Sequence, residues 1–279
     1  MTTDEQAKAT EEVAKTTGKF AEIAEKVGGF ISKVIGPASN QVGGVLEDWT
    51  RYFRFRNLLG IGDKVEAIHA QRKVQGKTMP ISPRIAIPML ESAALEDDET
   101  LQDVWARLIA NSTDPKFEAA IHPGYIEIVK QLSPDEAVIL QSFLKLESYP
   151  ILFKKHFTAE YGREKEMALS YFWTMQGRQE SYMAVLETCI SHCRQSALKK
   201  PEDAQVYIDN LIRLRIIELG HNFSGEEQDA HSFIFKTVHR TRSKEENASV
   251  TIPARDEFLR VTAFGQSFMM ACISDTPSK

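Results

Sequence analysis

Apolar residues recur at helical spacing from the start of the chain to about residue 148. In the first segment they lie three, four and seven positions apart. They are Val13, Phe20, Ile23, Ala24, Val27, Phe30, Ile31 and Val34. This stripe predicts an amphipathic helix whose apolar face must be buried against another surface. Gly29, Gly36 and Gly43 also lie seven apart, and Pro37 predicts a break close to residue 36. Residues 1–46 are therefore predicted to form an amphipathic, glycine-bearing helical segment that is interrupted near residue 36.

Helix-start signals divide the next part of the chain. They are Ser82 with Pro83, Asp97 or Asp98, and Ser133 with Pro134. Serine and aspartate accept hydrogen bonds from the first free N–H groups of a helix, and proline fits its first turn. Residues 47–148 are therefore predicted to form an all-helical domain.

Strand-forming patterns enter only in the last part of the chain. Helical spacing continues to about residue 197 and returns over residues 203–215, but IIELGHNF, SFIFKTVHR and NASVTI favour strands. The order of a helix over YIDNLIRLR, hairpin-like strands and the closing FLRVTAFGQSFMMACI resembles a winged helix. The predicted fold class is mainly α, with an N-terminal helical bundle and a C-terminal winged-helix-like α+β domain over residues 149–279.

Charge is distributed unevenly along the chain. The net charge of −5 argues against a dedicated nucleic-acid binder. Between Trp49 and Arg84 eight bases face two acids, a balance of +6, and between Glu91 and Glu118 eight acids face two bases, a balance of −6. Neighbouring segments of opposite charge are expected to pack against one another.

Two groups of residues are the predicted interaction surface: part of the first apolar stripe and an aromatic-basic cluster. They are Phe20, Val27, Phe30, Ile31, Trp49, Arg51, Tyr52, Arg54 and Arg56. Such a mixture suits a protein partner, self-association through the N-terminal helix or a peripheral contact with lipid headgroups. Packing of the stripe within the protein's own helices is the more common arrangement. Pro37, Ser39 and Asn40 argue against a membrane-spanning helix.

A basic group at the expected wing tip is the candidate for nucleic-acid contact. It consists of Arg240, Arg242 and Lys244. Acidic residues near it and the acidic chain as a whole make this role the less favoured one.

Candidate catalytic chemistry is weak. Asp97, Asp98 and Asp103 are the residues that a metal-dependent nuclease would use, but consecutive helical carboxylates point in different directions. Cys189 and Cys193 lack the second ligand pair of a closed zinc site. No catalytic, cofactor-binding or metal-binding residue is therefore predicted. The three cysteines and the polar N-terminus favour a cytoplasmic protein, with membrane association left open.

Several motifs, in this order, resemble the Abi-alpha family, which is named for abortive infection in bacteria. They are RYFRFRNLL, LESAALEDDETLQDVWARLIANSTDP, HPGYIEIVKQLSPDEAVIL, NLIRLRIIE and LRVTAFGQSFMMAC. The resemblance implies a role in defence against phage and brings no catalytic residues with it. The expected function is a non-enzymatic defence protein that contacts a protein partner or a membrane surface. A nucleic-acid-binding winged-helix regulator is the alternative.

Overall fold

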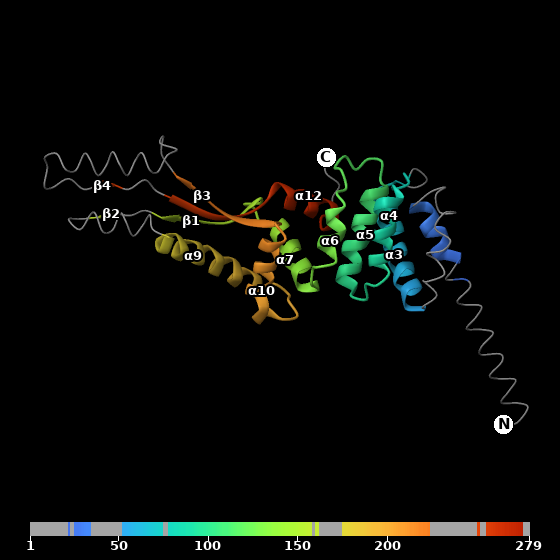
Figure 1. The fold of residues 1–279 in the computed structure, drawn as a ribbon, viewed down its shortest axis with the longest axis horizontal. Helices are drawn as coiled ribbons and strands as arrows, with labels where there is room; N and C mark the ends of the chain where they lie inside the picture. Colours follow the sequence, from blue (N-terminus) through green and yellow to red (C-terminus); the bar gives the residue numbers. More distant parts are fainter. Residues whose placement is uncertain are drawn as a thin grey trace, which may run out of the picture. The chain divides into compact units, whose positions relative to one another are not determined.

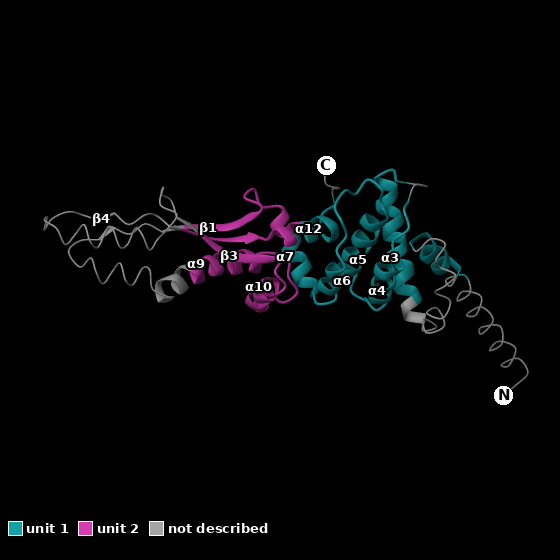
Figure 2. Cartoon of the chain, turned by 45° about the horizontal axis from the view of Figure 1, so that its top comes forward, with its two compact units in different colours: residues 1–141, 267–279 teal, residues 142–266 magenta. Residues whose placement is uncertain are grey.

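The computed structural model describes residues 22, 25–34, 52–74, 78–157, 160–161, 175–223, 250–251 and 255–275 (Figure 1). These residues form mainly helices together with a small three-stranded antiparallel sheet, which confirms the predicted predominance of helix. The chain divides into two compact units, residues 1–141 with 267–279 (unit 1) and residues 142–266 (unit 2) (Figure 2). The predicted domain boundaries at residues 46 and 148 stay predictions.

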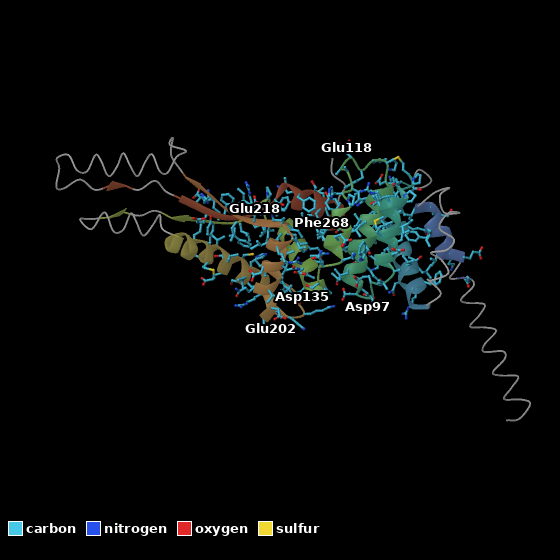
Figure 3. The ribbon with its side chains drawn as sticks, in the orientation of Figure 1. Asp97, Glu118, Asp135, Glu202, Glu218 and Phe268 are labelled. Atoms are coloured by element: carbon cyan, nitrogen blue, oxygen red, sulfur yellow. The ribbon has the colours of Figure 1, made fainter. Side chains whose placement is uncertain are left out.

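Unit 1 contains helices in its described part. They are a helix over residues 25–34, α3 (Tyr52–Gln71), α4 (Pro83–Ala93), α5 (Glu99–Thr113), α6 (Gly124–Val129), the start of α7 (Pro134–Leu144) and the end of α12 (Ala263–Cys272). α3 lies along α5, and α4 contacts α3, α5 and α6. Trp105 and Leu108 of α5 are fully buried, as their helical spacing predicts. The ring of Phe268, labelled in Figure 3, meets Tyr125 edge-on with 5.7 Å between centroids.

The acidic run before α5 starts this helix. Asp98 is its N-cap, and its carboxylate accepts hydrogen bonds from the backbone N–H groups of Thr100 and Leu101 at 2.9 and 3.3 Å. Asp97 is exposed. The cap predicted at one of these two positions is therefore Asp98.

The predicted packing of the basic segment on the acidic segment is confirmed, because α3 lies along α5 and two ion pairs join them. The Lys64 ammonium lies 2.5 Å from the Asp103 carboxylate, and the Arg72 guanidinium lies 3.9 Å from that of Asp114. The Arg72 pair is almost fully buried. The acids that meet the basic segment thus lie within α5 and at its C-terminal end.

A capping box begins α7. The Ser133 hydroxyl accepts a hydrogen bond from the Glu136 N–H at 3.3 Å, and the Glu136 carboxylate accepts one from the Ser133 N–H at 2.6 Å. This reciprocal pair satisfies two backbone donors that a helix start otherwise leaves unpaired. Both donors lie in a part-buried position, where an unpaired N–H costs stability.

Replacing Ser133 by alanine is expected to destabilise the protein by about 1 kcal/mol, because the hydroxyl acceptor is lost. Urea denaturation followed by circular dichroism measures the change. Ser82→Ala is the matched control: Ser82 is the N-cap of α4, but its side chain makes no capping hydrogen bond. Equal effects of the two substitutions would contradict the capping role of Ser133.

Unit 2 contains a sheet with helices against it. The sheet order is β1 (Ile151–Phe157), β5 (Arg255–Val261) and β3 (Ile217–Phe223), antiparallel throughout, and β2 (Glu160–Tyr161) pairs separately with β4 (Val250–Thr251). α9 (Met175–Arg194) contacts β1 and β5. After the short 3-10 helix Pro201–Asp203, α10 (Ala204–Arg213) contacts α9 and β3. The predicted helix over residues 203–215 and the first strand after it are confirmed.

The prediction that helical segments continue to about residue 197 is wrong at β1, which is a strand. ILFKKHF is only seven residues long, too short for its periodicity to separate a strand from a helix turn. Its conformation is set by pairing with β5, where Phe153 faces Leu259 and Lys155 faces Glu257. That partner lies about a hundred residues later in the chain, so a local pattern does not reveal it.

Candidate functional site

A pocket of about 330 Å³ lies beneath the helix over residues 25–34. Described residues from four parts of unit 1 line it: that helix, α3, the segment before α4, and the end of α5. Its lining residues are Phe30, Lys33, Val34, Val65, Glu66, His69, Thr78 and Thr113. Backbone hydrogen bonds hold these parts together, from Ile81 N–H to the Val34 carbonyl at 2.8 Å and from Met79 N–H to the Thr113 carbonyl at 2.9 Å.

The imidazole of His69 is a buried polar group in the wall of the pocket, and only 8% of this residue is exposed. Its Nε2 lies 3.2 Å from the Ala110 carbonyl and 3.1 Å from the Thr113 hydroxyl oxygen. A carbonyl oxygen can only accept, so Nε2 carries the hydrogen and donates. The Thr113 hydroxyl donates to the Ile109 carbonyl at 2.9 Å and is free to accept from Nε2. In neutral His69 the lone pair is therefore on Nδ1.

No described residue forms a hydrogen bond with Nδ1 of His69. The other ring nitrogen is fixed by its partners on α5, so the ring cannot flip without losing them. The result is a hydrogen-bond acceptor held in one orientation in the wall of a pocket.

Apolar side chains form the other walls. Phe30, Val34 and Val65 are all buried. The Phe30 ring packs on α3 at Gly62, where an added Cβ would lie 3.3 Å from the ring. Glycine therefore allows the close approach of the helix over residues 25–34 to α3.

One ion pair lies at the edge of the pocket. The Lys33 ammonium donates to the Glu66 carboxylate at 2.7 Å, and the two side chains are 65% and 62% exposed. A pair this exposed contributes little stability. Its two charges cancel, so this pair adds no net charge to the described lining.

The predicted interaction residues of the first helix lie inside the fold. Val27, Phe30 and Ile31 are buried, which is the packing within the protein that the sequence favoured. Their exposed neighbours, Lys26 and Ser32, face outward. An interaction role for the apolar face stays a prediction and requires this helix to leave its groove.

The rest of the predicted interaction surface is only partly described. Arg56 is exposed on α3, and Tyr52 and Arg54 lie on α3 with side chains outside the described part. Others lie outside the described residues altogether. These are Phe20, Trp49 and Arg51, together with the wing-tip candidates Arg240, Arg242 and Lys244.

Two of the three acidic candidates for a nuclease have structural partners. Asp98 caps α5, Asp103 pairs with Lys64, and Asp97 is exposed. Among the described residues, no three His, Cys, Asp or Glu side chains gather as a metal ion would require.

The two cysteines of α9 form a buried apolar pair. A hydrogen bond that the Cys189 thiol donates to Cys193, and then burial, raise the pKa of Cys189, which favours its thiol form. Metal binding uses the thiolate. The neighbouring His192 packs near the rings of Phe143 and Phe153, with centroid distances of 6.4 and 5.4 Å.

Replacing Glu96 by glutamine is expected to stabilise the protein at neutral pH by less than about 1 kcal/mol. Burial raises the pKa of Glu96, although hydrogen bonds from the Asp98 N–H and the Trp105 indole oppose the shift. Above the unfolded-state pKa the folded protein holds this proton more tightly, so stability falls as pH rises through the folded-state pKa. Glutamine can accept the same hydrogen bonds without this cost.

The gain from Glu96→Gln should vanish below the ordinary pKa of glutamate, where both states are protonated. Urea denaturation at several pH values measures it, with the exposed Glu91→Gln as the control. A gain that is independent of pH would contradict the assignment to ionisation.

The pocket was not predicted from the sequence. Val65 and His69 lie four positions apart on α3, in line with the buried Leu58 and Ile61, so a histidine interrupting an apolar stripe was a visible signal. Nothing in the local pattern places Thr78 or Thr113 beside it, because both come from later segments.

Within the described residues, no helix is both long enough and apolar enough to cross a membrane.

The family profile described as Abortive infection alpha matches residues 56–272. No curated protein and no solved structure matches the chain.

Proposed function

The chain belongs to the abortive infection alpha family, and from this premise we propose that it is a non-enzymatic defence protein acting through contact with a protein partner. Family membership supports the role in abortive infection. The helix over residues 25–34 is the proposed contact element.

One observation carries the proposal: this helix is docked through a single apolar face. Val27, Phe30, Ile31 and Val34 are buried, while the opposite side carries exposed polar residues and glycine. An added Cβ at Gly28 or Gly29 would have no atom within 4 Å, so no described residue packs on the helix at these two positions. A partner offering an equivalent apolar groove could receive the same face.

The energetics favour transfer of the helix over residues 25–34 from unit 1 to a partner. An isolated helix of about ten residues is marginal in water, so its order depends on docking. Burial of each large apolar side chain contributes about 1.5–3 kcal/mol before the loss of conformational entropy is subtracted. The net free energy that holds this helix on unit 1 is therefore a few kcal/mol. Binding of the same helix to a partner can supply a free energy of this size.

A plaque assay tests this function in cells that carry the protein. Ile31→Asp places a charge on the apolar face and is expected to abolish protection. Ser32→Asp, a neighbouring exposed position, is the matched control and is expected to retain it. Soluble abundance and circular dichroism of both variants must match the native protein. Full protection by Ile31→Asp would contradict the proposed contact.

Membrane contact is the competing use of the same face. Flotation with vesicles of phosphatidylglycerol and phosphatidylethanolamine distinguishes contact with a membrane from contact with a protein partner. Binding that Ile31→Asp removes would favour a membrane surface over a protein partner.

A second candidate function is nucleic-acid binding by a winged-helix-like unit 2. The order α7, β1, β2, α9, α10, β3, β4, β5, with β5 central in the three-stranded sheet, supports it. Asp209 on the exposed side of α10 and Glu202 before this helix oppose it, because carboxylates repel phosphate groups. Fluorescence anisotropy with duplex DNA tests it: binding should weaken steeply with salt and on replacing Arg240 and Arg242 by alanine. Binding that is absent or insensitive to salt would exclude it.

A further inference from the structure

We propose that the pocket beneath the helix over residues 25–34 binds a small, uncharged ring compound that carries one N–H donor. The inference does not depend on the role in defence. The size of the pocket, the charge of its described lining and the fixed orientation of His69 support it.

The size of the pocket limits the ligand. Small-molecule sites in proteins span about 300–1000 Å³, and this pocket of about 330 Å³ is at the lower end. One ring or two fused rings fill such a space. The Phe30 ring and the side chains of Val34 and Val65 offer apolar walls for them.

The charge of the lining selects an uncharged ligand. Lys33 and Glu66 pair with each other at 2.7 Å. A charged ligand would have to leave water for apolar walls where no described side chain offers an unpaired charge, which is unfavourable.

The acceptor is Nδ1 of His69. Its position is fixed because Nε2 donates to the Ala110 carbonyl and to the Thr113 hydroxyl. A ligand N–H that reaches Nδ1 satisfies the one ring nitrogen for which no described residue is a partner. An isostere without this donor would leave a polar atom buried and unpaired.

The ligand would also hold the helix in place. Phe30 and Val34 belong to the helix over residues 25–34, whereas Val65 and His69 belong to α3. A compound that contacts both sides binds only the docked arrangement, so it stabilises docking by mass action.

Two isomeric probes test the donor directly. 5-Fluoro-3-methylindole and 5-fluoro-1-methylindole have the same apolar groups, but only the first keeps its N–H. Fluorine NMR titration of the full chain with each probe measures both affinities. The first is expected to bind with a dissociation constant of about 1 mM or tighter, and the second at least about fivefold more weakly.

Two variants locate the binding. Val65→Trp places an indole in the pocket and should abolish binding of the free probe. His69→Phe keeps a ring at this position but removes both ring nitrogens, so the two probes should bind about equally. His122→Phe, at an exposed histidine of unit 1 outside the pocket, is the matched control and should preserve the difference.

Hydrogen exchange supplies an independent readout. Saturation with 5-fluoro-3-methylindole should slow amide exchange in the helix over residues 25–34. Absent binding, equal affinity of the two isomers, or binding unchanged in Val65→Trp would each overturn the proposal. If the protein binds the probe as expected but gives no protection against phage, the proposed binding site is supported and only the proposed function is refuted.

Discussion

Alanine in place of Gly265 is expected to destabilise the protein by about 3 kcal/mol, although alanine is the better helix former. Gly265 lies in the first turns of α12, and its Cβ position is occupied by the backbone of Ile216 in the turn between α10 and β3. An added Cβ would clash with the Ile216 carbonyl oxygen and would lie 2.8 Å from its carbonyl carbon. Backbone cannot move aside as a flexible side chain can.

Hydrogen bonds fix the two segments at this point. Thr262 N–H donates to the Ile216 carbonyl at 2.9 Å, and the Thr262 hydroxyl donates to the Arg215 carbonyl at 2.6 Å. Separating the backbones enough to admit a methyl group would stretch these bonds. The predicted loss is therefore larger than the gain in helix propensity.

Gly28→Ala is the control for this prediction. Gly28 is also helical, but an added Cβ there has no atom within 4 Å. Alanine should stabilise the protein by about 0.5–1 kcal/mol at this position. Urea denaturation of both variants tests the opposite signs, and a stabilising effect of Gly265→Ala would contradict the observed contact.

Replacing Arg72 by methionine is expected to destabilise unit 1 by about 3–5 kcal/mol, because it leaves the buried Asp114 carboxylate without its cation. Arg72 lies 3.9 Å from Asp114 and donates to the Asn111 side chain at 2.5 Å. Burial lowers the pKa of Arg72, while Asp114 opposes the shift. The Asn111 amide in turn donates to the Ala271 carbonyl at 2.7 Å, so the network reaches the C-terminal segment.

Adding Asp114→Asn to Arg72→Met should recover much of the loss, because it removes the uncompensated charge. Asparagine can still accept the hydrogen bond that the Lys116 N–H makes to Asp114 at 2.9 Å. Lys130→Met removes an exposed ion pair with Glu127 and should change stability by less than about 0.5 kcal/mol. Urea denaturation with hydrogen exchange of α5 measures these changes. Absence of rescue would show that Arg72 acts by packing alone.

The helical elements were predictable because their signals are local. Asp98 caps α5, Ser133 and Glu136 form a capping box, and Trp105 is buried at its helical position. Each of these outcomes depends on residues a few positions apart. The amphipathic pattern of residues 25–34 likewise identified a buried face.

The strand β1 and the pocket were not predictable in this way. β1 is defined by its pairing with β5, and His69 meets Thr113 across 44 positions of sequence. Contacts at such separations depend on how the elements pack.

The sequence by itself determined where helices begin, which of their faces are apolar, and which family the chain resembles, because these features follow from residue spacing and short motifs. Only the tertiary structure decided which surface covers the apolar face of residues 25–34 and that Asp103 and Asp114 serve as ion-pair partners. It also showed that Gly265 is required by the backbone of Ile216. Those outcomes depend on distances between segments that are remote in sequence, and hydrophobic periodicity contains no information about such distances.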